Sequence, residues 1–432
     1  MKDIKNITSI ARRNFCSKSG KILLGSSLIP LSSTWLMAQG CSKEAVKEVV
    51  VEDIPKPIIL DKEIVYIDQP SGYRSIPNDS NFRNVHNLPG LPSTIKVDYP
   101  WEKERLIGNN QGYITSNVFV DPNNEYILQL MLSTPGTPDT STGSPQYKTR
   151  YRVSTDGGAT FSEVKLLQIE GYTKDNPIKG VEIGRNGYNV NFTTPIIQAK
   201  SGKIVIPINL HPWDDVNKKI YNPANAYIFQ DAGAIIGTWN STSKSFTWEF
   251  GEWLRIDHNV STRGLSEPSI VELKDGRFAM TARGSNLNRP DLPGYTWVSF
   301  SSDHCMTWSV PVPLTYSTGE NFFVPASCST IFRSRINGRL YWIGNLVNSN
   351  PESNYPRFPL VIGEVNEKNF GLIKETVLQI DTRNPDKEGE KMQLSNFKIL
   401  EHNQRNEIIV VVTRLELSKA AKAPCWYQIQ LT

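Results

Sequence analysis

Residues 264–283 read GLSEPSIVELKDGRFAMTAR and contain two apolar runs separated by Asp275-Gly276. An Asp-Gly pair between apolar segments of this length is a strong signal for a β-hairpin with a tight turn. Glu267 opens the first predicted strand and Arg283 closes the second, so an antiparallel return brings both to the same end of the hairpin. Because a buried charge is costly without water or a partner, we expect that end to face a wet cleft.

Four other segments of the chain repeat this design of apolar run, turn and apolar run. The five turns lie at Asn124, Gly202, Gly276, Gly338 and Arg405. Intervals of roughly 60–80 residues indicate a repeat architecture rather than one sandwich. If two outer strands complete each hairpin, the result is an all-β fold, a β-propeller of four-stranded blades. The residues that follow the leader suit six blades, with seven as the alternative.

A second motif follows the hairpins in three places. Its copies are STDGGATF at Ser154–Phe161, SSDHCMTW at Ser301–Trp308 and a degenerate STSKSFTW at Ser241–Trp248. These segments resemble the Asp-boxes of the sialidase-like β-propeller superfamily. The Asp side chain can cap a tight turn while the aromatic residue packs between blades, so we interpret the motif as structural.

The resemblance implies a site for an acidic sugar. In that superfamily a Glu at the Glu267 position activates a tyrosine nucleophile, and an Arg at the Arg283 position helps to grip the sugar carboxylate. Arg357, in YPRFPL, is similar to a further arginine of that grip. Two guanidiniums aimed at one carboxylate would form a bidentate clamp.

The chain departs from the superfamily pattern in two places. Leu394-Ser395-Asn396 stands where the tyrosine would be, and Tyr113-Ile114-Thr115-Ser116 stands where the first arginine would be. Arg74, within YRSIP, superficially matches that arginine motif, but no apolar strand follows it and we interpret it as a loop residue. Without the tyrosine, the retaining sialidase mechanism has no nucleophile.

The favoured chemistry is therefore elimination at a uronic acid sugar, by a polysaccharide lyase or a dehydratase. Elimination needs a neutralised carboxylate, a base and an acid. A more distant resemblance to propeller-fold ulvan lyases implies the same solution, although their tyrosine position corresponds to Glu267 here. The expected catalytic residues are His211, Glu267 and Tyr188. The expected substrate-binding residues are Arg283, Arg357, Arg414, Asn209 and Asn345.

Two other functions remain open. One is an exo-acting glycoside hydrolase of sialidase type, with Glu267 as acid or base and Asp214 or Asp215 as a second carboxylate. The other is a glycan-binding lipoprotein without activity. The products distinguish elimination from hydrolysis, because only elimination creates an unsaturated uronate.

The N-terminal region predicts export. Residues 1–40 read as an export signal in which Arg12-Arg13-Asn14-Phe15 resembles a twin-arginine motif. Ala38-Gln39-Gly40-Cys41 resembles a lipoprotein cleavage box with Cys41 as the acylated residue. Residues 41–60 form a predicted tether, and residues 61–432 a single propeller domain. We expect a cell-envelope protein, either periplasmic or an outer-membrane lipoprotein that contacts the membrane only through its lipid.

Charge and cysteine usage narrow the range of partners. The formal net charge is +4, and the basic leader accounts for it, which leaves no basic field for nucleic acid. Cys305, Cys328 and Cys425 follow the leader and are interpreted as buried free thiols. No metal-ligand spacing or cofactor motif is present, so we expect no metal site and no cofactor. The expected partner is an acidic oligosaccharide or polysaccharide, bound by a monomer.

Overall fold

The structure is a computed structural model that describes residues 54–64, 82–84, 112–123, 125–134, 148–190, 194–416 and 421–432. These residues belong to one compact unit, Asp53–Thr432. The predicted export signal and Cys41 lie outside the described residues. No helix among the described residues is long and apolar enough to cross a membrane.

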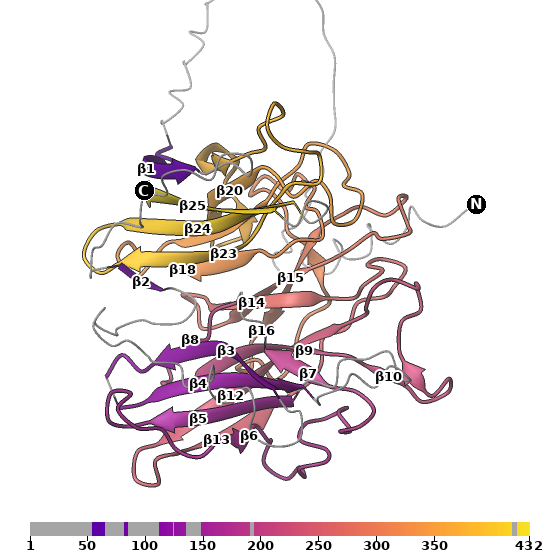
Figure 1. Cartoon of the computed structure of the whole chain (residues 1–432), viewed down its shortest axis with the longest axis vertical. Coiled ribbons are helices and arrows are strands. Elements are labelled where there is room, and N and C mark those ends of the chain that lie inside the picture. Colours follow the sequence, from indigo (N-terminus) through magenta and orange to yellow (C-terminus); the bar gives the residue numbers. More distant parts are fainter. Residues whose placement is uncertain are drawn as a thin grey trace, which may run out of the picture. The chain divides into compact units, whose positions relative to one another are not determined.

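The described strands form five antiparallel sheets and one short hairpin (Figure 1). The first sheet contains β3 (Gly112–Val120), β4 (Ile127–Thr134), β5 (Lys148–Ser154) and β6 (Lys165–Leu166). The second contains β7 (Tyr188–Val190), β8 (Ile197–Gln198), β9 (Ile204–Leu210), β12 (Asp231–Asn240) and β13 (Ser245–Phe250). The third contains β14 (Ser266–Glu272), β15 (Phe278–Arg283), β16 (Thr296–Ser301) and β17 (Val312–Pro313).

The remaining sheets continue the series. The fourth contains β18 (Thr330–Arg333), β19 (Leu340–Asn345), β20 (Leu360–Asn366), β21 (Gly371–Leu372) and β22 (Leu378–Asp381), and a short 3₁₀ helix at Lys374–Thr376 precedes β22. The fifth contains β23 (Gln393–His402), β24 (Glu407–Glu416), β25 (Ala421–Gln430), β1 (Ile58–Ile64) and β2 (Phe82–Asn84). The hairpin consists of β10 (Trp213–Asp214) and β11 (Lys219–Ile220).

Successive sheets pack face to face, as the blades of a propeller do. Four apolar clusters fill the spaces between the first and second, second and third, third and fourth, and fourth and fifth sheets. The all-β, propeller-like arrangement predicted from the hairpin repeat is therefore confirmed. Five blades are described, and the expected count of six or seven stays a prediction.

The chain closes its last blade with its own N-terminal strand. β1 pairs with β25 from Ile58 opposite Gln430 to Ile64 opposite Cys425. Residues 58–60 therefore belong to the propeller, and the predicted boundary of the tether at residue 60 was wrong. The burial of β1 alternates as in an edge strand covered on one face, but the sequence IILDKEI does not alternate between apolar and polar residues and so did not indicate a strand.

Hydrogen bonds from buried side chains connect each described blade to the next. The Nδ2 atom of Asn117 donates to Thr194 O over 3.3 Å, that of Asn209 to Leu265 O over 3.1 Å, and that of Asn345 to Leu394 O over 3.0 Å. Between the third and fourth blades the Ser269 hydroxyl donates to Ile331 O over 3.3 Å. Asn209 and Asn345, which we expected to bind substrate, are 1% and 0% exposed and hold blades together instead.

Both intact Asp-boxes have the predicted capping structure. In the turn after β5, Asp156 Oδ1 accepts the Thr160 N–H over 2.9 Å, and Asp156 Oδ2 accepts the Thr160 hydroxyl over 2.6 Å. In the turn after β16, Asp303 Oδ1 accepts the Thr307 N–H over 2.9 Å. Cys305, in the glycine position of that box, has a φ of +68°. These contacts support a structural role for the motif.

Candidate functional site

Glu267 occupies a β-bulge at the start of β14. The β14–β15 ladder shifts register between Ser266 and Ser269, and Glu267 has a φ of +50°. Its backbone N–H donates to Asn209 Oδ1 over 3.0 Å, so the amide that joins the two blades also fixes the bulge. A bulge redirects a side chain, and a left-handed non-glycine residue persists only where its surroundings hold it. Both features are common at functional sites.

Arg283 contacts Glu267 directly, as the hairpin predicted. The ladder sets Ser266 opposite Arg283, and Arg283 Nη1 lies 2.8 Å from Glu267 Oε2. The two side chains are 11% and 21% exposed, so the pair is shielded but not sealed from solvent. Removing one member of such a pair leaves an uncompensated charge.

Arg357 belongs to the same cluster and is held rigidly. Its Nη1 donates to Gln393 Oε1 over 2.7 Å, its Nη2 to Ala326 O over 2.8 Å and its Nε to Asn354 O over 3.1 Å. Burial lowers the pKa of Arg357, and the positive charge of Arg283 lowers it further. The guanidinium is therefore fixed in position close to another cation.

Arg263 is a third guanidinium, which the sequence motifs did not indicate. It precedes β14, is 8% exposed, and its Nη1 donates to Asn354 Oδ1 over 3.3 Å. Burial lowers the pKa of Arg263 to about 10, and the neighbouring Arg283 and Arg357 add to the effect while Glu267 opposes it. Its Nε has no hydrogen-bond partner among the described residues. The only signal for it in the sequence was its position, four residues before Glu267.

Cys328 and Asn396 bring the corresponding positions of the next blades to the cluster. Asn396 lies at a bulge in β23 with a φ of +58°, much as Glu267 does in β14. The Cys328 thiol donates to Asn396 Oδ1 over 3.0 Å. Burial raises the pKa of Cys328 to about 12, and Glu267 is the next cause. The thiol is therefore protonated and is not a nucleophile. The side chain at the position where the superfamily has its tyrosine is the amide of Asn396.

His211 and Tyr188 do not reach this cluster in any described contact. His211 is 2% exposed, and burial lowers its pKa to about 4. Tyr188 is 0% exposed, and its hydroxyl donates to Leu167 O over 2.6 Å. Burial also raises the pKa of Tyr188. Tyr188 is thus part of the apolar core between the first two blades, and His211 is buried beside Gln230. The burial of both side chains argues against the acid and base roles expected for them.

Arg414, which we expected to bind substrate, does not lie in the cluster either. The β23–β24 ladder sets Thr413 opposite Ser395, which makes Thr413 the counterpart of Arg283. Arg414 therefore points to the other face of the sheet. There it is fully buried and bonded to both carboxylate oxygens of Glu388 at 2.6 Å.

The second carboxylate considered for hydrolysis is likewise engaged elsewhere. Asp214 Oδ1 accepts the backbone N–H groups of Val216 and Asn217, each over 3.0 Å, and caps the turn between β10 and β11. Asp215 is exposed and lies 3.7 Å from Lys218. Among the described residues, the acidic side chain that contacts the arginine cluster is that of Glu267.

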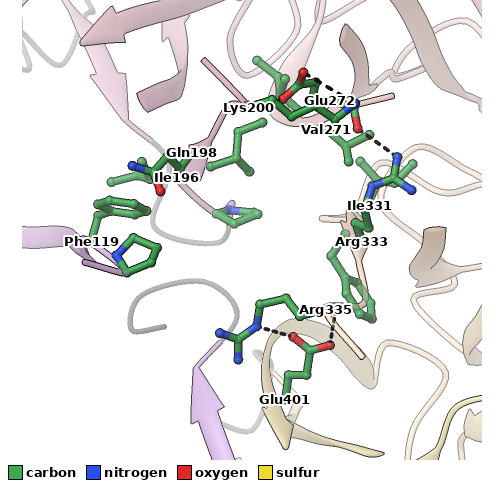
Figure 2. Close-up of a pocket in the computed structure, with 15 residues that line it drawn as sticks. Phe119, Ile196, Gln198, Lys200, Val271, Glu272, Ile331, Arg333, Arg335 and Glu401 are labelled. Carbon is green, nitrogen blue, oxygen red and sulfur yellow. Dashed lines mark hydrogen bonds and ion pairs between the residues drawn. The ribbon is translucent and has the colours of Figure 1, made fainter. Parts of the chain in front are cut away.

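A separate cavity of about 420 Å³ opens at the other end of β14, beside Glu272. Figure 2 shows its apolar wall, which includes Phe119, Val271 and Ile331, and its charged groups. Each cation of this cavity has a carboxylate partner of its own. Arg335 Nε lies 3.0 Å from Glu401 Oε2, Lys200 Nζ lies 3.9 Å from Glu272 Oε1, and Arg333 Nη2 lies 2.7 Å from Glu367 Oε1. In the Glu267 cluster, by contrast, three guanidiniums share one carboxylate.

A metal centre finds no support in the described residues, which contain no group of three or more His, Cys, Asp or Glu side chains able to hold an ion.

Solved structures resemble this chain only at low sequence identity. No protein-family model matches the chain, and no curated protein does so. A protein of unknown function from Dyadobacter fermentans is 11% identical with a TM-score of 0.40, over 88% of this chain and 100% of that one. A Hadza microbial sialidase is 14% identical with a TM-score of 0.46, over 76% of this chain and 54% of that one.

An intramolecular trans-sialidase from Ruminococcus gnavus is 12% identical with a TM-score of 0.44, over 78% of this chain and 82% of that one. The chain spans about half the length of the Hadza sialidase and 59% of a leech intramolecular trans-sialidase. Sialidase-like β-propellers are thus among the solved structures to which this chain is similar.

Proposed function

We propose that the protein is a carbohydrate-active enzyme that binds a terminal acidic sugar at Glu267, Arg263, Arg283 and Arg357 and hydrolyses the bond to it. The observation that carries the proposal is the excess of positive charge in this cluster: Arg283 pairs with Glu267, and Arg263 and Arg357 lie close enough to interact electrostatically with both. An anionic sugar would supply the second negative charge. Guanidiniums recognise carboxylates well because their donors match the two oxygens in geometry.

Hydrolysis suits the cluster better than elimination does. The elimination hypothesis drew its acid and base from His211, Glu267 and Tyr188, and of these His211 and Tyr188 are buried, at 2% and 0% exposed. The Glu267 carboxylate can take a proton from an attacking water, which is the general-base role in an inverting reaction. The departing sugar oxygen takes its proton from solvent, because no second carboxylate contacts Glu267 among the described residues. One of the solved structures to which this chain is similar is a microbial sialidase, and sialic acid is an acidic terminal sugar of the kind proposed here.

Product analysis tests this proposal directly. The purified protein is incubated with sialylated oligosaccharides and with oligosaccharides that end in a uronic acid, and products are followed by mass and ultraviolet absorbance. Hydrolysis adds one water across the two products and creates no absorbance. An unsaturated, absorbing uronate would instead establish elimination. Binding without turnover across the whole panel would establish a glycan-binding protein.

We also propose that the protein is exported and anchored in the cell envelope through Cys41. The proposal rests on the basic, apolar leader and on the Ala38–Cys41 segment. Labelling growing cells with a palmitate analogue checks it: the wild-type chain should take up the label and a Cys41→Ser variant should not. Equal labelling of both would refute acylation at Cys41.

A further inference from the structure

Asn396 occupies the same kind of position in the fifth blade as Glu267 does in the third. Each residue lies at a register shift in the first strand of its hairpin, β23 or β14. Each also has a left-handed backbone, with a φ of +58° at Asn396 and +50° at Glu267. A non-glycine residue keeps such a backbone only where its surroundings hold it. The two positions are therefore built alike, in the blades on either side of the fourth.

The thiol of Cys328 connects these two positions. Cys328 precedes β18, the first strand of the fourth blade, and is 4% exposed. Its Sγ donates to Asn396 Oδ1 over 3.0 Å, and it also interacts with the Glu267 carboxylate. The carboxylate and the amide therefore meet around one buried, neutral sulfur atom.

The thiol also decides which way the Asn396 amide faces. A protonated thiol donates a hydrogen bond, so it selects the oxygen of the amide and leaves the nitrogen on the other side. Among the described residues, Asn396 Nδ2 has no hydrogen-bond partner, and Asn396 is exposed. An amide N–H donor is thus presented to solvent next to the carboxylate that we assign as the general base.

A carboxylate and an amide N–H can hold one water molecule between them. The water donates one hydrogen to the carboxylate and accepts one from the amide, each over about 2.8–3.0 Å. One of its two lone pairs is then still available for attack. Arg283 binds Oε2 of Glu267, which leaves Oε1 to receive the proton. With the carboxylate alone, the water would be free to rotate about a single hydrogen bond.

We propose that Asn396 positions the water molecule that Glu267 deprotonates, and that Cys328 holds the Asn396 amide in the orientation this requires. The inference rests on the proposed hydrolysis of an acidic sugar. The water oxygen bonds to the anomeric carbon as the bond from that carbon to the departing oxygen breaks. The departing oxygen keeps the electron pair and takes a proton from solvent, while Glu267 receives the proton of the water and returns it to solvent. The sugar is released with inverted anomeric configuration.

Asn396→Gly removes the amide without straining the backbone, because glycine adopts a left-handed φ readily. The substrates are the 4-methylumbelliferyl glycosides of N-acetylneuraminic acid and glucuronic acid, and calorimetry with the sulfur-linked methyl glycosides gives affinity. For the preferred sugar, kcat should fall by about 10²-fold because the water is misplaced, while affinity stays within about twofold. Asn225→Gly, at another exposed asparagine with a left-handed φ of +49°, should behave like the wild type.

Two variants of Cys328 test the orientation of the amide separately. Cys328→Ser keeps a donor to Asn396 Oδ1, whereas Cys328→Ala removes it and lets the amide rotate. We expect kcat to be about fivefold lower in Cys328→Ala than in Cys328→Ser, with equal affinity for the sulfur-linked glycoside. Equal kcat values in these two variants would overturn the inference, and the pair decides it even where Asn396→Gly does not fold.

The remaining outcomes are distinct from one another. Wild-type kcat in a folded Asn396→Gly variant would overturn the inference and leave the proposed hydrolysis intact. A loss confined to affinity would also overturn it, because Asn396 would then bind the sugar and not the water. Nuclear magnetic resonance identifies the anomer released first, and a retained configuration would exclude direct attack by a positioned water. If the wild type hydrolyses neither glycoside, the proposed function fails and the inference with it.

Discussion

At the scale of single residues, the site depends on where one carboxylate is directed. Glu267 is forced out of the regular ladder by the bulge, held there by Asn209, and neutralised by Arg283. Cys328 packs against it as a neutral thiol, which adds no competing charge. The arrangement leaves a carboxylate oxygen that can accept a proton next to cations that can hold an anionic substrate, which is what a general base for such a substrate requires.

Glu267→Gln should therefore separate catalysis from binding. The amide cannot accept a proton from water, so kcat should fall by about 10²–10⁴-fold. Affinity for the acidic sugar should stay the same or rise, because the substitution removes a negative charge from the cluster. Steady-state kinetics and calorimetry measure the two effects. Glu252→Gln, at an exposed glutamate, is the control, and a wild-type rate in Glu267→Gln would exclude Glu267 as the base.

At the scale of elements, each described blade is joined to the next by a buried polar side chain. In the second and fourth blades this side chain is an asparagine at the end of the second strand of the hairpin, Asn209 in β9 and Asn345 in β19. In the third blade the equivalent position holds Arg283, and Ser269 makes the connection instead. In the blade that carries the candidate site, a cation therefore occupies the position that holds a connecting amide in the second and fourth blades.

Asn345→Ala should destabilise the fold. It removes the donor to Leu394 O and Pro359 O, two carbonyls in a buried region. The expected loss is about 1–3 kcal/mol of unfolding free energy. Denaturant unfolding measures it, with Asn217→Ala in the exposed β10–β11 turn as the control. Equal midpoints for the two variants would show that the amide does not connect the blades.

Features confined to one hairpin could be read from the sequence. The repeated hairpins, the capping contacts of the Asp-boxes and the Glu267–Arg283 pair all depend on residues less than about twenty positions apart. Arg357 was found through a motif alone. Arg263 carries no motif, and its contacts come from the packing of separate blades. Arg414 was misassigned because a shift of one residue reverses the face of a strand, and the sequence does not show the bulge at Asn396 that sets the register.

At the scale of the whole molecule, stability should depend on pH through buried histidine. Burial lowers the pKa of His211 to about 4, whereas an unfolded histidine titrates near 6.5. Above that value both states are neutral and His211 contributes no dependence. As the pH falls from about 6.5 to about 4 the unfolded chain binds a proton that the folded chain does not, so stability is lost.

His211→Gln should flatten this part of the stability curve. Titration of His211 should lower the free energy of unfolding of the wild type by about 3 kcal/mol between neutral pH and pH 4. The variant lacks this group, so its free energy of unfolding should fall by about 3 kcal/mol less over the same range. Unfolding midpoints at a series of pH values give the comparison. His258→Gln, at a residue that is not buried, should follow the wild-type curve. Parallel curves for the wild type and His211→Gln would contradict the burial of a neutral imidazole.

The central claim is that cations from separate segments of the propeller hold the carboxylate of a sugar. The most direct test is calorimetric titration of the preferred acidic glycoside into Arg283→Ala, with Arg277→Ala in the exposed β14–β15 turn as the control. We predict that Arg283→Ala binds at least about 100-fold more weakly than the wild type, while Arg277→Ala is unchanged and both variants stay folded. Wild-type affinity in a folded Arg283→Ala variant would contradict the account.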